Sequence, residues 1–370
     1  MEVVAEGILN PSTAGGPRSV AIFPSVTVVP GGRILATYRV ARGKDADVEE
    51  VELRSSADGG ATWSVPSTPF STVHRGVQGS LRVVYLTSLA GADLIAVTMW
   101  INRSAFPGKP LFNPETDGCL PAAILVANSS DGGDSWSAWR EVPMPDDVGP
   151  PSLTNPVLRL HDGRLAISIE TNKPYLDTTK WKQRVVYTFS ADGGETWSAP
   201  RTMCEDPAGR LMNWDQRAAV APDGRLATYT WTFDPESHRY LPIARRVSHD
   251  GAASWSAAEW LGFSDQPARP AVFPDGSVVL AWVDRFGLGA IRARRATLFD
   301  GPFPDESEVV VYRHHKDSGR TFTTTETLAD MSTWSYGLPF VEALPDGDAL
   351  LVYYAGTADA TDIRWARLRS

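Results

Sequence analysis

The sequence predicts an all-β fold, a six-bladed β-propeller of four-stranded antiparallel blades in which the N-terminal strand closes the last blade. Three observations predict it: an octapeptide ending in Trp that recurs along the chain, a series of tight turns between strand-like runs, and a last repeat that lacks one strand. A repeat architecture spreads one core over all its units. We therefore expect residues 1–370 to form a single propeller domain.

The octapeptide follows the pattern Ser-x-Asp-x-Gly-x-(Ser/Thr)-Trp, and its copies or close variants occupy residues 56–63, 129–136, 190–197 and 248–255. Internal repeats of this kind indicate propellers or arrays, and successive copies lie about 60 to 75 residues apart, which is room for one four-stranded blade.

Six short turns form a second, independent repeat, and strand-like runs flank each of them. They lie at residues 30–32, 90–93, 161–163, 222–224, 274–276 and 345–347. Asp-Gly between alternating hydrophobic runs is a strong hairpin signal, because Gly accepts the positive φ of tight turns. Each turn is expected to join the innermost strand of a blade to the second strand.

The last blade is one strand short, because only residues 349–354 and 362–368 remain as strands after the sixth turn. The run Glu2 to Leu9 can supply the missing strand. That closure would join the two ends of the chain and remove an exposed sheet edge.

Composition and charge narrow the classes of function. A net charge of -9 argues against nucleic-acid binding, which concentrates Lys and Arg on one surface. No apolar run approaches the roughly 18 residues of a membrane span, so no membrane partner is expected. The N-terminus shows no signal-peptide pattern, which favours a cytoplasmic protein. No motif for a metal or other cofactor is present, and none is expected.

The octapeptide resembles the Asp box of the sialidase (neuraminidase) superfamily, and the resemblance extends over all the predicted blades. It implies that each box forms the turn between the third and fourth strands of a blade, away from the catalytic face. Asp58, Asp131, Asp192 and Asp250 would then bond their own turns rather than substrate.

The first blade is the most sialidase-like, in the run Ile22-Phe23-Pro24-Ser25 through Arg39. Sialidases place an Arg two residues before that Pro, where it helps to clamp the sialic acid carboxylate. Here the position is Ile22, which cannot bond a carboxylate. The substrate is therefore expected to differ from ordinary sialic acid, with Arg39 as a candidate contact.

The resemblance also implies catalytic positions. Asp47, with Asp45 close behind, lies in the loop that carries the acid/base in sialidases. Tyr336 matches the nucleophile, and Asp215 matches the carboxylate that activates it. A phenol needs such a base, because its pKa of about 10 leaves it weakly ionised at neutral pH.

Glu170 is the centre of a rival catalytic set, paired with Asp47 or Asp215, because most glycosidases use two carboxylates and related arabinan-degrading propellers do so. Further candidates for substrate binding are Arg217, Arg269, Asp284, Trp214 and Trp334. Two long insertions, residues 102–120 and 314–333, are candidates for functional loops.

The leading hypothesis is a sialidase-like glycoside hydrolase whose partner is a carbohydrate. The alternative is a noncatalytic carbohydrate-binding or scaffold propeller, since one fold supports many functions. A polysaccharide lyase, in which Tyr serves as acid and base, is a third possibility.

Overall fold

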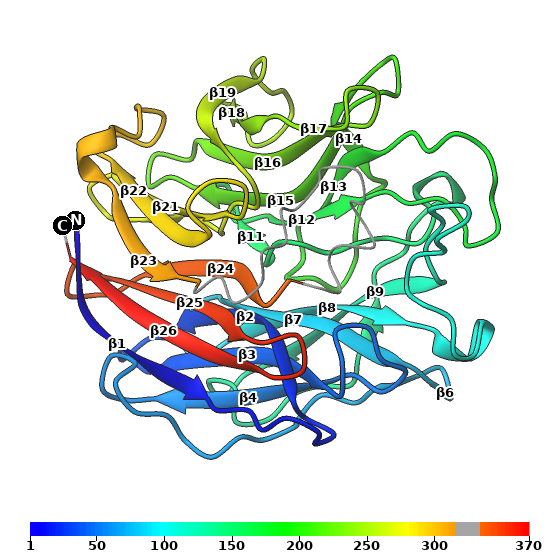
Figure 1. Ribbon diagram of the computed structural model, residues 1–370, viewed down its shortest axis with the longest axis horizontal. Helices are drawn as coiled ribbons and strands as arrows, with labels where there is room; N and C mark the ends of the chain where they lie inside the picture. Colours follow the sequence, from blue (N-terminus) through cyan, green and yellow to red (C-terminus); the bar gives the residue numbers. More distant parts are fainter. Residues whose placement is uncertain (315–333, 370) are drawn as a thin grey trace.

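The computed structural model describes residues 1–314 and 334–369, so all but His314 of the predicted 314–333 loop lies outside the described residues. The described chain is all-β, with antiparallel sheets arranged as a propeller (Figure 1). Its helices are the three-residue 3-10 turns η1 (Arg103–Ala105), η2 (Asp146–Val148) and η3 (Asp305–Ser307). None of these helices has the length or apolar character needed to cross a membrane.

Four blades are separate sheets. Their strands are, in chain order, β7 (Ser80–Ser88), β8 (Leu94–Ile101), β9 (Ala122–Ser129) and β10 (Arg140–Glu141); β11 (Leu158–Arg159), β12 (Leu165–Glu170), β13 (Arg184–Ser190) and β14 (Arg201–Glu205); β15 (Met212–Val220), β16 (Leu226–Asp234), β17 (Arg239–Tyr240), β18 (Pro242–Ser248) and β19 (Glu259–Ser264); and β20 (Ala271–Val272), β21 (Val278–Asp284), β22 (Ala290–Ala296) and β23 (Val309–Arg313).

A fifth sheet has seven strands and contains both ends of the chain. Its strands are β1 (Glu2–Asn10), β2 (Val20–Val28), β3 (Ile34–Ala41), β4 (Glu50–Ser56), β24 (Tyr336–Ala343), β25 (Ala349–Gly356) and β26 (Thr361–Arg369). One group consists of β2, β3 and β4, and the other consists of β24, β25, β26 and β1. The two groups join through one parallel bridge, Val20 to Thr361. The remaining short strands, β5 (Val73–His74) and β6 (Val77–Gln78), form a separate ribbon.

The predicted closure by the N-terminal strand is confirmed. β1 pairs antiparallel with β26 from Glu2–Arg369 to Asn10–Ile363, and the two chain ends lie together in Figure 1. All six predicted turns join the innermost strand of a blade to the second strand: β2 to β3, β7 to β8, β11 to β12, β15 to β16, β20 to β21 and β24 to β25. The predicted strands 349–354 and 362–368 are β25 and β26.

The octapeptides form the turns after β4, β9, β13 and β18, as predicted. In the third copy, Asp192 accepts hydrogen bonds from the Thr196 amide at 2.9 Å and hydroxyl at 2.6 Å. The Trp255 ring of the fourth copy packs on Tyr187 of the preceding blade, with ring centroids 5.6 Å apart. The boxes therefore close their turns and fill the space between blades.

The hydrophobic core lies between neighbouring blades. One cluster joins Leu35 of β3 to Leu81 of β7, and another joins Tyr229 of β16 to Trp282 of β21. Every residue of the second strand β3 is buried, because this strand has a blade on each side. The first strands β2, β7 and β24 lie toward the middle of the ring, where side chains from different blades can meet (Figure 1).

Candidate active site

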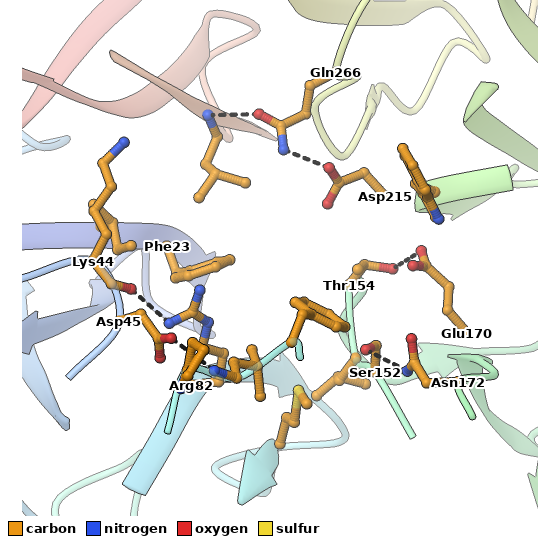
Figure 2. Close-up of a pocket in the computed structure, with 18 of the residues that line it drawn as sticks. Phe23, Lys44, Asp45, Arg82, Ser152, Thr154, Glu170, Asn172, Asp215 and Gln266 are labelled. Atoms are coloured by element: carbon orange, nitrogen blue, oxygen red, sulfur yellow. Dashed lines mark hydrogen bonds between the residues drawn. The ribbon is translucent and has the colours of Figure 1, made fainter. Parts of the chain in front are cut away.

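A cavity of about 640 Å³ lies where the ends of the inner strands meet (Figure 2). Its wall comes from four sheets of the ring, from the segment before β20 that supplies Gln266, and from the 102–120 insertion, which supplies Pro110 to Pro114 and Asp117. The other lining residues are Ile22, Phe23, Lys44, Asp45, Arg82, Met99, Ser152, Leu153, Thr154, Glu170, Asn172, Trp181, Trp214, Asp215, Trp231, Gln266, Trp334, Leu338 and Tyr354.

β-Bulges in the inner strands turn four of these side chains into the cavity. The strand register shifts between Ile22 and Ser25, between Leu81 and Val83, between Trp214 and Arg217, and between Gly337 and Phe340; the lining residues within these shifts are Phe23, Arg82, Asp215 and Leu338. Three of them have positive φ, namely Phe23 (56°), Asp215 (46°) and Leu338 (47°). Such backbone costs roughly 1 kcal/mol or more per residue and clusters at functional sites.

Glu170, the last residue of β12, is a buried carboxyl on this wall. Its Oε1 atom accepts hydrogen bonds from the Gln216 amide at 2.8 Å and from the Thr154 hydroxyl at 3.0 Å. Burial, and next the charge of Asp215, raise the pKa of Glu170 to about 8. Glu170 is therefore mainly protonated at neutral pH.

Asp215 lines the same cavity in a different environment. Its Oδ2 accepts a hydrogen bond from Gln266 (Figure 2). Its Oδ1 lies 3.7 Å from Arg217 Nη2. Arg217 is itself buried, where its Nη1 donates to Tyr85 at 2.9 Å and to the carbonyl oxygen of Thr154. Arg217 thus holds Asp215 and Thr154 in place from behind the wall.

Four Trp side chains form an aromatic wall beside the two carboxyls: Trp181, Trp214, Trp231 and Trp334. The Trp214 ring packs 6.2 Å from Trp181 and 6.1 Å from Trp231, and Trp231 lies 5.7 Å from Trp334. Arg285 stacks on Trp334 at 3.8 Å and is paired with Asp265 at 2.7 Å. Trp214, Trp231 and Trp334 are largely buried and form a core cluster with Phe233, so the predicted Trp214 and Trp334 line the cavity as members of that cluster.

The opposite side of the cavity is basic. Arg82 Nη1 donates to Glu49 at 2.8 Å and to the carbonyl oxygen of Lys44 at 2.7 Å. Glu49 is fully buried and also pairs with Arg39 and, at 3.3 Å, with Arg103. Arg39 is therefore a buried partner of Glu49 behind the wall rather than a lining residue.

Of the two loop acids, Asp45 lines the cavity and Asp47 does not. Asp45 accepts hydrogen bonds from Arg103 and from the Leu111 amide, both at 2.7 Å. Burial alone would raise the pKa of Asp45, but Arg82, Arg103 and the Leu111 amide outweigh it and leave that pKa below its ordinary value.

Tyr336 does not line the cavity, so it does not meet Asp215 there. Its hydroxyl lies 3.5 Å from the carbonyl oxygen of Asp284, and its ring stacks on His314 at 4.8 Å. Burial raises the pKa of Tyr336 far above its ordinary value. The phenol on the cavity wall is Tyr354 of β25, whose hydroxyl accepts from Lys44 Nζ at 3.4 Å.

The two remaining candidates also lie outside the wall. Arg269 pairs with Glu342 and stacks on Phe340 at 5.4 Å. Asp284 accepts hydrogen bonds from the Gly287 amide at 2.8 Å and from Arg292 at 3.0 Å, so it closes the turn after β21.

The sequence analysis missed Arg82, Thr154, Gln266 and Tyr354 as lining residues. Arg82 lies within a β-bulge, which the alternation of apolar and polar residues along a strand cannot reveal. The one signal in the sequence was a charged residue within the otherwise apolar run Leu81–Leu86. Among the residues that the structure describes, no three His, Cys, Asp or Glu side chains gather as a metal site would require.

No family model matches this sequence, and no curated protein matches it. Solved structures are similar in fold. A Dyadobacter fermentans protein of unknown function has a TM-score of 0.75 and 18% identity, over 100% of this chain and 99% of that chain.

Two enzymes have nearly the same fold. The intramolecular trans-sialidase of Ruminococcus gnavus has a TM-score of 0.66 and 14% identity, over 98% of this chain and 96% of that chain. The α-L-arabinanase of Penicillium chrysogenum, solved with arabinobiose, has a TM-score of 0.65 and 16% identity, over 99% of this chain and 98% of that chain. The chain thus shares the propeller fold of sialidases and of an arabinanase.

Proposed function

We propose that this chain is a glycoside hydrolase on a six-bladed, sialidase-like propeller, with Glu170 and Asp215 as its catalytic carboxyl pair. Dividing the seven-stranded sheet at its single parallel bridge, Val20 to Thr361, gives two blades, and with the four separate sheets they make six. The observation that carries the proposal is that Glu170 and Asp215, two of the carboxyl groups that line the cavity, lie in contrasting environments.

The different environments of the two carboxyl groups suit one to act as an acid and the other as a base. Glu170, with its raised pKa, can hold the proton that a glycosidic oxygen needs on leaving. Asp215, beside Arg217, suits the anionic role of nucleophile or base. Gln266 and Arg217 fix the position of the Asp215 carboxylate, and Thr154 fixes that of Glu170.

The apolar Ile22 on the wall supports a substrate other than ordinary sialic acid. An aliphatic side chain there gives no charge-assisted bond to a carboxylate. Trp181, the half-buried Trp of this wall, supports a sugar as the partner, because flat apolar faces of sugars pack on indole rings while hydroxyls reach polar groups.

The test is release of aryl leaving groups from a panel of sialoside, arabinoside, uronide and hexoside substrates. We expect Glu170→Gln and Asp215→Asn each to lower kcat at least about 100-fold on the preferred sugar, since positioned acid–base groups contribute about 10²–10⁴-fold. Tyr336→Phe is the matched comparison and should keep most activity. Turnover that survives in Glu170→Gln or Asp215→Asn, or that disappears in Tyr336→Phe, would contradict this pair.

A noncatalytic carbohydrate-binding propeller is the second candidate, favoured by the four Trp side chains and by Tyr336 lying off the wall. It predicts no turnover of any panel member, with sugar binding that persists in Asp215→Asn. Loss of binding in a Trp181→Ala variant, without any turnover by the wild type, would favour this candidate over the hydrolase.

A further inference from the structure

The basic side of the cavity carries one positive charge more than its carboxylates neutralise. Three guanidinium groups, those of Arg39, Arg82 and Arg103, surround two carboxylates, Glu49 and Asp45. The side chains of Arg39 and Arg103 are 0% and 7% exposed, whereas that of Arg82 is 15% exposed and faces the cavity. The excess charge is therefore presented to a ligand through Arg82.

Arg82 also keeps a pair of donors for that ligand. Its Nη1 atom makes both protein hydrogen bonds, to Glu49 and to the Lys44 carbonyl oxygen. Within residues 1–314 and 334–369, Nε and Nη2 of Arg82 have no hydrogen-bond partner, and the guanidinium lies 5.0 Å from the Phe23 ring centroid. Nε and Nη2 form the side-on fork that binds the two oxygens of a carboxylate.

The second cation of this side, Lys44, is engaged differently. Its Nζ atom donates to Tyr354 at 3.4 Å. Burial, and then the charges of Arg285, Arg39 and Arg82, lower its pKa well below the ordinary value. Of these two side chains, Arg82 is therefore the one whose geometry suits a bidentate bond to a carboxylate.

The position of Arg82 distinguishes two kinds of acidic sugar. In Figure 2, Arg82 lies across the cavity from Glu170, beyond the open centre. In a uronic acid the carboxylate lies on C5, across the ring oxygen from the glycosidic bond. In a 2-ulosonic acid such as sialic acid the carboxylate is on the anomeric carbon itself, next to the scissile bond.

We propose that Arg82 is a specificity-determining residue that binds the C5 carboxylate of a uronic acid, placing its anomeric carbon beside Glu170 and Asp215. This inference rests on the proposed carboxyl pair and names the substrate class of the same site. The apolar neighbours Ile22, Phe23 and Met99 strengthen the ion pair by limiting water around it.

The experiment measures binding rather than turnover, so it is independent of the hydrolase proposal. D-Glucuronate and D-galacturonate are titrated against wild type in parallel with D-glucose, D-galactose and N-acetylneuraminate. We expect at least one uronate to bind 10-fold or more tightly than its neutral hexose. Arg82→Gln should remove that preference while leaving hexose affinity within about twofold.

Two variants keep the test interpretable. Arg201→Gln, an exposed Arg on β14, makes the same change in charge away from the cavity and should keep the preference. Arg82→Lys retains the charge beside Glu49 but loses the side-on fork, so it should fold and keep only part of the preference. Thermal unfolding of each variant shows whether the buried arginine cluster survives.

Several outcomes would overturn the proposal: hexoses binding as tightly as uronates, a uronate preference that survives in Arg82→Gln, preferential binding of N-acetylneuraminate, or no binding of any of these sugars by wild type. Failure of the hydrolase proposal would instead appear as turnover retained in Glu170→Gln or Asp215→Asn, whatever the uronate titrations give.

Discussion

Glu170 and Asp215 show how neighbouring residues give two similar side chains different chemistry. The Glu170 carboxyl is buried and receives neutral donors, from the Gln216 backbone amide and the Thr154 hydroxyl. Asp215 has a guanidinium 3.7 Å away and is the less buried of the two. Because the charge of Asp215 penalises ionisation of Glu170, removing Asp215 should lower the pKa of Glu170.

The raised pKa of Glu170 predicts that the protein loses stability between about pH 4.5 and pH 8. The folded state holds the proton up to about pH 8, whereas the unfolded chain releases it near the ordinary value of 4.5. The unfolded state thus binds fewer protons in this window, so the free energy of unfolding falls as pH rises, by on the order of a few kcal/mol in total.

Thermal unfolding of wild type and Glu170→Gln at pH 5 and pH 8 checks this. The variant should unfold at a higher temperature than wild type at pH 8, and its advantage should shrink at pH 5. Glu205→Gln, an exposed Glu on β14, is the control and should leave the wild-type pH dependence unchanged. Parallel pH dependences in wild type and Glu170→Gln would mean that Glu170 ionises normally in the folded protein.

At the scale of strands and turns, the regular features of this fold could be predicted and the irregular ones could not. Asp-Gly turns and the octapeptides depend on local chemistry, so their positions in the sequence located the hairpins and the outer turns correctly. The lining residues depend on bulges, and a one-residue shift moves a side chain to the other face of the strand.

Individual residues show which cavity-lining side chains could not be predicted from the sequence. The resemblance to sialidases pointed to Asp215, whereas Arg82 and Gln266 required knowledge of the bulge in β7 and of the bend before β20. Tyr336 and Tyr354 both lie near the cavity end of one hairpin, and their residues pair in neighbouring register positions. The sequence alone could not show whether Tyr336 or Tyr354 would line the cavity, because the backbone there is shifted by the bulge between Gly337 and Phe340.

The Asp boxes are expected to support stability without contributing to sugar recognition. In the third box, Asp192 accepts from the Glu195 and Thr196 amides, the Thr196 hydroxyl and the Ser190 hydroxyl. Asp192→Ala should lower the melting temperature by several degrees, because these turn donors lose their acceptor. Sugar binding below that temperature should be unchanged, since no residue of 190–197 lines the cavity.

Glu195→Ala is the matched control for this prediction, because it removes an exposed carboxylate from the same turn without touching the network around Asp192. Differential scanning calorimetry of the two variants makes the comparison. Equal melting temperatures would show that the Asp192 bonds add nothing to the folded state, and weaker sugar binding by Asp192→Ala would show that the box acts on the cavity.

At the scale of the whole molecule, the ring depends on the pairing of its two chain ends. β1 lies along β26, and without it β26 would be an open sheet edge. The strands pack closely at Gly7, where a Cβ atom would lie 2.8 Å from Trp365 Nε1. Ser12 also ties the N-terminal segment to β26, through a hydrogen bond from its amide to Asp362 at 2.9 Å.

Gly7→Leu should therefore displace β1 and weaken the closure. The Trp365 ring is buried among core side chains, so the added side chain should cost about 1–3 kcal/mol, as overpacking does. Gly16→Leu is the control, because its Cβ would meet only the Thr13 carbonyl oxygen at 3.6 Å, an ordinary contact. Urea unfolding measures the free energies, and light scattering reports association through the exposed edge of β26. If Gly7→Leu matched Gly16→Leu in both measurements, the ring would not depend on β1, and the cavity would have to be held by the inner strands alone.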